Sequence, residues 1–374
     1  MKALCDRLVA EGLPLARTTL HARTLHPLIV GQRFLWQRGV EEIDVLNAEF
    51  ALLESQSWVL SPIRMLLEEG AAAVRQRLDV PEVPLTLPLY EELRAEGLTD
   101  YVALPLTNSK TSAVSMTFAT DRPGGFTTEE LIELYDLLPA LAPILEVHSV
   151  RRLAVNVLNT YVGRQAGELI LDGRIHRGDG ETINAALWYC DLRGFTALSA
   201  RHDRDTLIGI LNAYFEAMAE PVARYGGETL KFIGDAMLAM FPMSRRGACL
   251  EALNAALEAR AAMGQLNRER MAAGHEPLGF GIALHVGDVM YGNIGAPDRL
   301  DFTVIGPAVN MVVRLQELCK TLGRTVLSTN AFASLSPFSY ERIGRHHLRG
   351  LPEPITVFTP LEPGADEALA LPGN

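Results

Sequence analysis

The spacing of apolar and polar positions predicts two α+β units in this chain of 374 residues, one in each half. In the second half, short apolar runs predict strands at residues 185–190, 228–233, 236–241 and 279–286. Apolar residues at helical spacing predict helices at residues 205–225 and 245–273. The resulting order, strand–helix–strand–strand–helix–strand, is that of the ferredoxin-like fold.

An extension follows this core. The pattern predicts a short hairpin arm, a strand at residues 300–305 and a helix at residues 307–321. A closing strand, helix and strand pair end near residue 359. We therefore place the second domain at residues 181–360 and expect a loose tail at residues 361–374.

The first domain, residues 1–147, also mixes predicted strands and helices. Strands are expected at residues 16–26, 29–37, 101–105 and 113–120, with a polar turn at residues 108–110. Helices are expected at residues 62–78 and 89–96, and another begins where Thr127 and Glu130 can form a capping box. Helices around an antiparallel sheet indicate an α+β class.

A connecting helix and linker are expected at residues 148–180. Val150, Leu153, Val157 and Tyr161 repeat at intervals of three and four residues. This stripe suits pairing with the same helix of a second chain, or packing of the helix against its own domain. Fewer than three heptads leave both interpretations open.

The composition is that of an ordinary globular protein, with 48% hydrophobic and 21% charged residues. No apolar stretch approaches the roughly 20 residues that span a bilayer, and the N-terminus lacks a signal-peptide pattern, so we expect a cytoplasmic protein. A net charge of −11 without a basic stripe argues against a nucleic-acid partner. The four cysteines lie far apart without zinc-site spacing, and Cys190 is expected in the core.

Two aspartates stand where apolar runs end. Asp191 follows the strand predicted at residues 185–190, and Asp235 lies in the tight turn between the next two strands. Carboxylate oxygens suit a hard cation such as Mg²⁺ or Mn²⁺, and the backbone N–H groups of residues 192–195 suit phosphate oxygens bound to that cation. Each aspartate alone is also compatible with a helix cap or a turn. Together they indicate a metal–phosphate site.

The motifs DLRGFT, LKFIGDAML and FTVIGPAVNMVVRL resemble, in this order, the catalytic domain of class III nucleotide cyclases, over about residues 184–358. The resemblance implies an adenylate cyclase that converts ATP to 3′,5′-cyclic AMP and pyrophosphate. It implies that Asp191 and Asp235 hold two divalent metal ions, Mg²⁺ or Mn²⁺, that brace the triphosphate and activate the ribose 3′-hydroxyl. It also implies a homodimer whose site is split between protomers, and this chain carries both halves.

The same resemblance assigns the remaining site residues. Asn310 and Arg314, four residues apart on a predicted helix, are the catalytic pair: Asn310 orients the ribose and Arg314 meets charge on the α-phosphate. Arg349 is either a triphosphate contact or a solvated arginine. The segment after the first aspartate is assigned to substrate binding through Leu192, Arg193, Gly194, Phe195 and Thr196.

Base choice rests on Lys231 and Thr303. An ammonium donates and adenine N1 accepts, whereas guanine N1 carries a hydrogen, so Lys231 favours ATP. Thr303 can accept from the adenine amino group but could also donate to guanine O6. This chain resembles the subgroup with threonine there, some members of which respond to bicarbonate. A guanylate cyclase, or a catalytically silent binding or scaffolding homologue, stays an alternative.

The first domain resembles a GAF domain, chiefly over residues 100–146. The resemblance implies a regulatory unit with a small-molecule ligand, or a dimerising cap without one. His21 and His26 are candidate haem ligands and Cys5 a candidate bilin attachment site. A histidine on a strand is more often a surface residue or one satisfied by its neighbours, so these cofactor interpretations are not favoured.

Overall fold

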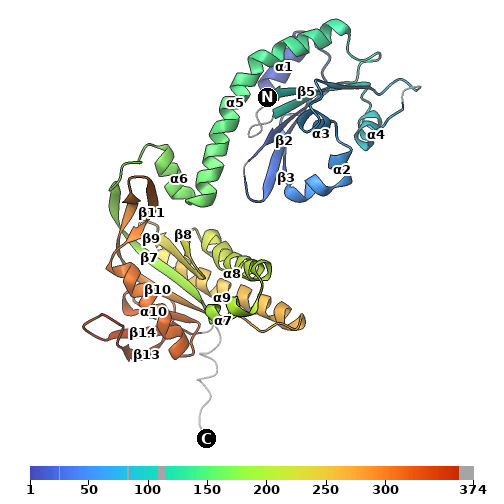
Figure 1. The fold of residues 1–374 in the computed structure, drawn as a ribbon. Coiled ribbons are helices and arrows are strands. Elements are labelled where there is room, and N and C mark those ends of the chain that lie inside the picture. Colours follow the sequence, from blue (N-terminus) through green and yellow to red (C-terminus); the bar gives the residue numbers. More distant parts are fainter. Residues whose placement is uncertain (25, 82–83, 108–113, 362–374) are drawn as a thin grey trace. The chain divides into compact units, whose positions relative to one another are not determined.

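The computed structural model describes residues 1–24, 26–81, 84–107 and 114–361. The chain is of mixed α+β class and forms two compact units, Met1–Tyr161 and Val162–Asn374 (Figure 1). The polar turn expected at residues 108–110, and all but the first residue of the expected tail, lie outside the described residues. Among the described helices, none has both the length and the apolarity to cross a bilayer.

Six antiparallel strands form the sheet of the first unit, in the order β3-β2-β1-β6-β5-β4. They are β1 (Arg17–Arg23), β2 (Ile29–Gln37), β3 (Asp44–Glu49), β4 (Val74–Arg77), β5 (Asp100–Thr107) and β6 (Val114–Thr120). The helices are α1 (Lys2–Ala10), the short η1 (Phe50–Glu54), α2 (Gln56–Val59), α3 (Pro62–Leu67), α4 (Pro88–Ala95) and α5 (Thr128–Tyr161).

The prediction of a helix at residues 62–78 is wrong for the second half of that segment. Helix α3 ends at Leu67, and Gly70 follows with φ +74°, a left-handed conformation that stops a helix. Residues 74–77 instead form β4, which pairs with β5 from Val74↔Ala103 to Arg77↔Asp100. Strand pairing between distant segments thus outweighs local helical preference.

Helix α5 is longer than expected and includes much of the predicted connector. Its capping box is confirmed, because the Glu130 amide donates to Thr127 Oγ1 at 3.2 Å and the Thr127 amide donates to Glu130 Oε2 at 2.8 Å. The helix continues for 34 residues to Tyr161. Gly163 then separates it from α6 (Arg164–Leu171), so the segment expected as a connecting helix and linker at residues 148–180 contains the end of one helix and the whole of another.

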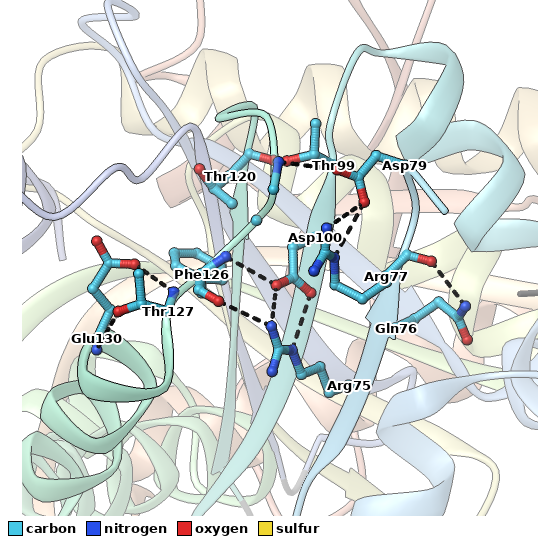
Figure 2. Close-up of polar contacts among 12 residues, drawn as sticks. Arg75, Gln76, Arg77, Asp79, Thr99, Asp100, Thr120, Phe126, Thr127 and Glu130 are labelled. Atoms are coloured by element: carbon cyan, nitrogen blue, oxygen red, sulfur yellow. Dashed lines mark hydrogen bonds and ion pairs between the residues drawn. The ribbon is translucent and has the colours of Figure 1, made fainter. Parts of the chain in front are cut away.

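A buried carboxylate fixes the start of α5 to the sheet. Asp100 on β5 is fully buried and accepts from Arg75 Nη2 at 2.6 Å and from the Phe126 amide at 3.0 Å (Figure 2). Arg75 Nη2 also donates to the Phe126 carbonyl at 3.0 Å. Gly125 has φ +71°, and a Cβ there would lie 2.5 Å from Asp100 Oδ2, so a glycine is required.

The second unit confirms the predicted ferredoxin-like order. The four core strands lie in the order β10-β7-β9-β8. Beyond β10 the sheet continues with β12, then β14, then β13. The strands are β7 (Gly180–Arg193), β8 (Glu228–Ile233), β9 (Ala236–Pro242), β10 (Gly279–Ala296), β11 (Arg299–Ile305), β12 (Val326–Thr329), β13 (Tyr340–His346) and β14 (Ile355–Pro360). The helices after α6 are α7 (Phe195–Arg201), α8 (Arg204–Arg224), α9 (Ala248–Ala272), α10 (Pro307–Thr321) and α11 (Asn330–Ala333).

The two faces of this sheet bury different helices. Trp188, Cys190 and other even-numbered residues of β7 pack in one core with α8 and α9. Leu187 and Tyr189 alternate to the other face and share a second core with Val312 and Leu315 of α10. Cys190 is fully buried, as expected, and burial raises the pKa of its thiol to about 12. Even-numbered residues of β7 therefore project toward α8 and α9, and odd-numbered residues project toward α10.

Candidate active site

Asp191 lies at the end of β7, on the face of the sheet that α10 covers. It pairs with Gly281 of β10 and with Ala236 of β9. A Cβ at Gly281 would lie 2.6 Å from Cys319 Cβ, so the C-terminal end of α10 packs closely at this level of the sheet. Asp191 is half-buried there, beyond the fully packed part of the strand.

Asp191 and Asp235 come together across β7 and β9. Asp235 follows β8 in the two-residue turn that leads to Ala236, the residue opposite Asp191. Burial, and a hydrogen bond to the Asp235 carboxyl, raise the pKa of Asp191 to about 7. Asp191 therefore holds a proton more tightly than an aspartate carboxyl in water does. Sequence reasoning predicted this pair, and the structure brings it together.

The pair fits a hard divalent cation. Two carboxylates that contact each other repel when both are ionised, and a divalent cation relieves this repulsion better than a proton does. Among the residues that the structure describes, no group of three or more His, Cys, Asp or Glu side chains could hold a metal. Mg²⁺ needs few protein ligands, because substrate phosphates and water complete its coordination.

The segment after Asp191 turns into a helix that sequence analysis missed. Gly194 precedes α7, and the Ala197 and Leu198 amides both donate to the Gly194 carbonyl at 3.0 Å. The guanidinium of Arg193 points to α10, where Nη2 donates to the Cys319 carbonyl at 2.8 Å and to the Arg324 carbonyl at 2.7 Å. These contacts give the Arg193 side chain a structural role.

The apolar side chains of this segment are also engaged. Leu192 is buried in the core with α8 and α9, and Phe195 packs against the same core. Any contact of Leu192 or Phe195 with a phosphate would therefore be made through the backbone. Thr196 is exposed in the first turn of α7.

Lys231 lies on β8 and forms an ion pair that the sequence did not indicate. Its Nζ is 2.8 Å from Asp301 Oδ2 on β11. Thr303 is two residues further along β11, opposite Gly292 of β10, and is 7% exposed. The ion pair between Lys231 and Asp301 connects β8 to β11, the strand that also carries Thr303. The two predicted base contacts therefore lie on connected strands of one protomer.

Asn310 and Arg314 lie on α10, as expected. Asn310 is exposed and Arg314 half-buried, and neither side chain has a hydrogen bond or ion pair to another described residue. A side chain at Gly350 would lie 3.3 Å from Arg314 Nη2, which places the exposed Arg349 in the loop beside Arg314. Both α10 side chains are therefore free to meet a ligand.

Asn310, in the first turn of α10, lies far from Asp191 of the same chain. A Cβ at Gly287 of β10 would lie 2.7 Å from Ala308 Cβ, in the first turn of α10, two residues before Asn310. Gly287 is six residues from Gly281, the partner of Asp191, a distance of roughly 20 Å along a strand. A single ribose cannot contact both ends of this span. The structure therefore does not bring Asn310 to the aspartates of its own chain.

A buried carboxylate that sequence analysis missed holds the start of α6. Glu228 is 8% exposed, and its Oε1 accepts from the Gln165 amide at 3.1 Å. The Tyr291 hydroxyl lies 3.3 Å from Glu228 Oε2, and the Tyr291 ring packs edge-on against Phe302 of β11. Glu228 thereby links the junction after α5 to the strand that carries Thr303.

The candidate cofactor residues of the first unit are engaged within it. Cys5 is fully buried, which raises the pKa of its thiol to about 11. His21 Nε2 lies 2.9 Å from Thr19 Oγ1, and His26 Nδ1 accepts from the Leu28 amide at 3.2 Å. These contacts fit the interpretation of both histidines as satisfied by their neighbours.

Known proteins share both the sequence pattern and the fold. The family described as "Adenylate and Guanylate cyclase catalytic domain" matches residues 180–360. An adenylate cyclase of Anabaena cylindrica is 33% identical over 161 residues, which are 42% of this chain and 32% of that protein. Adenylate cyclase 2 of Rhizobium meliloti (strain 1021) is 30% identical over 275 residues, 71% of this chain and 68% of that protein.

A solved structure of a bacterial light-regulated adenylyl cyclase superposes with a TM-score of 0.51 at 22% identity, covering 66% of this chain and 82% of that one. This likeness shows a shared fold. The chain spans about a third of the length of the first curated relatives that it matches. With the family match at residues 180–360 and the extended match to the Rhizobium protein, the chain belongs to the adenylate and guanylate cyclase family.

Proposed function

We propose that this protein is a homodimeric adenylate cyclase that converts ATP to 3′,5′-cyclic AMP and pyrophosphate. The observation that carries the proposal is the contact between Asp191 and Asp235 at the end of the central strands, with the pKa of Asp191 raised to about 7. Such a pair suits metal-assisted phosphoryl chemistry. The adenylate cyclases among the relatives support the choice of reaction.

Asp191 and Asp235 would hold the two divalent ions, Mg²⁺ or Mn²⁺. When bound, such ions supply positive charge to the triphosphate and make the ribose 3′-hydroxyl more acidic. The 3′-hydroxyl releases its proton to water, its oxygen forms a bond to the α-phosphorus, the bond between that phosphorus and the bridging oxygen of the β-phosphate breaks, and pyrophosphate leaves. Backbone amides of residues 192–196 lie just after Asp191 and are the groups of this segment that we assign to phosphate oxygens.

A second copy of the chain completes the site. Because Asn310 lies in the first turn of α10, more than about 15 Å along the sheet from Asp191 of its own chain, we assign the two residues of one active site to different protomers. Asn310 orients the ribose, and Arg314 donates to charge that develops on the α-phosphate. A two-fold dimer then has two complete sites and a monomer has none. Arg349, beside Arg314, is a further candidate for the triphosphate.

Lys231 and Thr303 recognise adenine through hydrogen bonds. The Lys231 ammonium donates to adenine N1, and Thr303 accepts from the 6-amino group. Asp301 holds the ammonium toward β11 and so positions it next to Thr303. Lys231 is poorly suited to guanine, whose N1 would present a hydrogen to the ammonium.

The first unit regulates this reaction in our proposal. Helix α5 leads from the first unit to α6, and Glu228 and Tyr291 connect the start of α6 to β11. A change in α5 would therefore reach the strand that carries Thr303. The GAF-like character of the first unit stays a prediction.

Parallel assays with ATP and GTP test the proposal. Purified full-length protein is supplied with each nucleotide and Mg²⁺ or Mn²⁺, and the cyclic nucleotide and pyrophosphate are quantified. We expect cyclic AMP and pyrophosphate in equal amounts from ATP and much less product from GTP. A preference for GTP would favour a guanylate cyclase, and no cyclic product from either nucleotide would favour a silent homologue.

A further inference from the structure

The first unit contains an apolar cleft on the sheet face that η1 and α2–α4 cover. Its volume is about 320 Å³, within the size range of small-molecule sites. The floor is formed by β1, β2 and β3, and the helices supply the walls. Most of the lining is apolar, including Val30, Leu46, Leu53, Trp58, Ile63 and Leu89.

The strand register explains why the cleft is open. His21, Arg33 and Leu46 form one row across the three strands. The next row is Arg23, Gly31 and Ala48, in which two of the three positions have little or no side chain. This row leaves space between the sheet and the helices. The first row places a guanidinium and an imidazole at the edge of that space.

The charged groups of the lining are mainly cationic. Arg33 pairs through Nη2 with Asp44 at 3.0 Å, but its buried Nε has no acceptor among the described residues. Arg23 is exposed at the cleft, and Glu92 is the one acidic residue among the described residues of the lining. Burial and the charges of Arg33 and Arg17 lower the pKa of His21 to about 4, so its ring is neutral and can donate or accept a hydrogen bond.

We propose that this cleft binds a small organic monoanion, an apolar body of about eight carbon atoms that ends in a carboxylate held by Arg33. The apolar walls take the body, and the guanidinium, with its unmatched N–H, takes the anionic end. The site belongs to the first unit alone. Its lining residues all belong to this unit, and binding can be measured without turnover, so a binding assay can fail or succeed whatever the catalytic assay shows.

Contact quenching of Trp58 provides a readout specific to the cleft. The chain has three tryptophans; Trp58 lines the cleft, whereas Trp36 and Trp188 are 1% and 0% exposed in other cores. A bromoalkyl group quenches tryptophan fluorescence only at short range. We therefore propose titration of the full chain with 8-bromooctanoate, and with 8-bromooctan-1-ol as the neutral counterpart.

We expect saturable quenching by the acid. The alcohol should bind with an affinity lower by about tenfold or more, because it lacks one hydrogen bond to a charged group. Arg33→Met should weaken binding of the acid by a similar factor, and Ala48→Phe should fill the cleft and abolish binding. Arg152→Met is the matched control, since Arg152 lies over Phe34, which points to the opposite face of the sheet. It should bind like the unchanged protein. Thermal melting of each variant verifies folding.

Several results would overturn the proposal. One is the absence of saturable quenching. A second is equal binding of the acid and the alcohol, which would show that Arg33 holds no anion. A third is quenching that persists in Trp58→Phe or in Ala48→Phe, which would place the probe elsewhere. Equal losses in Arg33→Met and Arg152→Met would likewise exclude a specific role for Arg33.

Discussion

The Nζ of Lys231 lies 2.8 Å from Oδ2 of Asp301, which ties β8 to β11 two residues from Thr303. The two side chains are 34% and 54% exposed, so the ion pair contributes little to stability, on the order of 0–1 kcal/mol. Its effect is positional. The pair holds an ammonium beside Thr303, where the proposed reading of adenine requires a donor.

The first prediction concerns this donor. Lys231→Ala should lower kcat/KM for ATP by about 10- to 100-fold, because one hydrogen bond to a charged group is lost. Lys231→Glu should also shift the preference toward GTP, since a carboxylate accepts from guanine N1. Steady-state kinetics with both nucleotides measure the effect. Unchanged kcat/KM ratios in both variants would remove Lys231 from base recognition.

Asp301→Asn provides the matched change to the other partner. It keeps the size of the side chain and removes the charge that holds Lys231. We expect a smaller loss, less than about tenfold in kcat/KM for ATP, with the preference for ATP retained. A larger loss than in Lys231→Ala would mean that Asp301 itself contacts the nucleotide.

The second prediction follows from the pKa of Asp191. Its folded value of about 7 is above the ordinary 3.8, so the protonated form stabilises the metal-free fold. This contribution is fully present below about pH 4 and is lost as the pH rises through about 7. Urea unfolding in the presence of a chelator should show that the free energy of unfolding falls from about pH 5 to about pH 8 more steeply than in Asp191→Asn. Equal slopes in the two proteins would contradict the raised pKa.

The third prediction tests the Glu228 contact. Glu228→Ala leaves the Gln165 amide and the Tyr291 hydroxyl without their acceptor, and should lower the free energy of unfolding by roughly 1–3 kcal/mol. Hydrogen exchange should accelerate in the first turn of α6. Glu168→Ala is the control, because Glu168 is exposed on the same helix. If both variants exchange alike, Glu228 does not hold the helix start.

The fourth prediction concerns the buried anchor of α5. Asp100→Ala leaves the Arg75 guanidinium and the Phe126 amide unpaired and should cost about 3 kcal/mol of stability (Figure 2). Glu68→Ala, which breaks an exposed pair with Arg64, should cost less than about 1 kcal/mol. Denaturant unfolding compares the two. Equal costs would show that the buried pair is not the anchor.

Much of the second unit could be predicted from the sequence, because its strands and helices are marked by local patterns. The apolar runs at residues 185–190 and 236–241 are interior strands whose composition alone identifies them. The Asp191–Asp235 contact was also predictable, since both residues end such runs. The helix predicted at residues 74–77 is a strand instead, because β4 pairs with β5, whose residues lie 23 to 29 positions further along the chain.

Contacts between distant segments could not be predicted. Lys231 and Asp301 are 70 residues apart, and Glu228 is 63 residues from both Gln165 and Tyr291. Each contact depends on the register of the strands and on the face of the sheet from which the side chain projects. A sequence pattern shows the alternation of apolar and polar residues along a strand, but it does not show which residues of distant strands pair with each other. The separation of Asn310 from Asp191 likewise follows only from the packing of α10 on β10.

Mixing two inactive variants tests the central claim most directly, namely that each active site combines two copies of the chain. Asp235→Ala and Arg314→Ala should each be inactive alone, since every site in either homodimer lacks one group. After subunit exchange of equal amounts, half of the dimers are mixed and each mixed dimer has one intact site, so about a quarter of the unmodified activity should return. If both variants fold and exchange subunits but the mixture stays as inactive as its components, the shared site is contradicted.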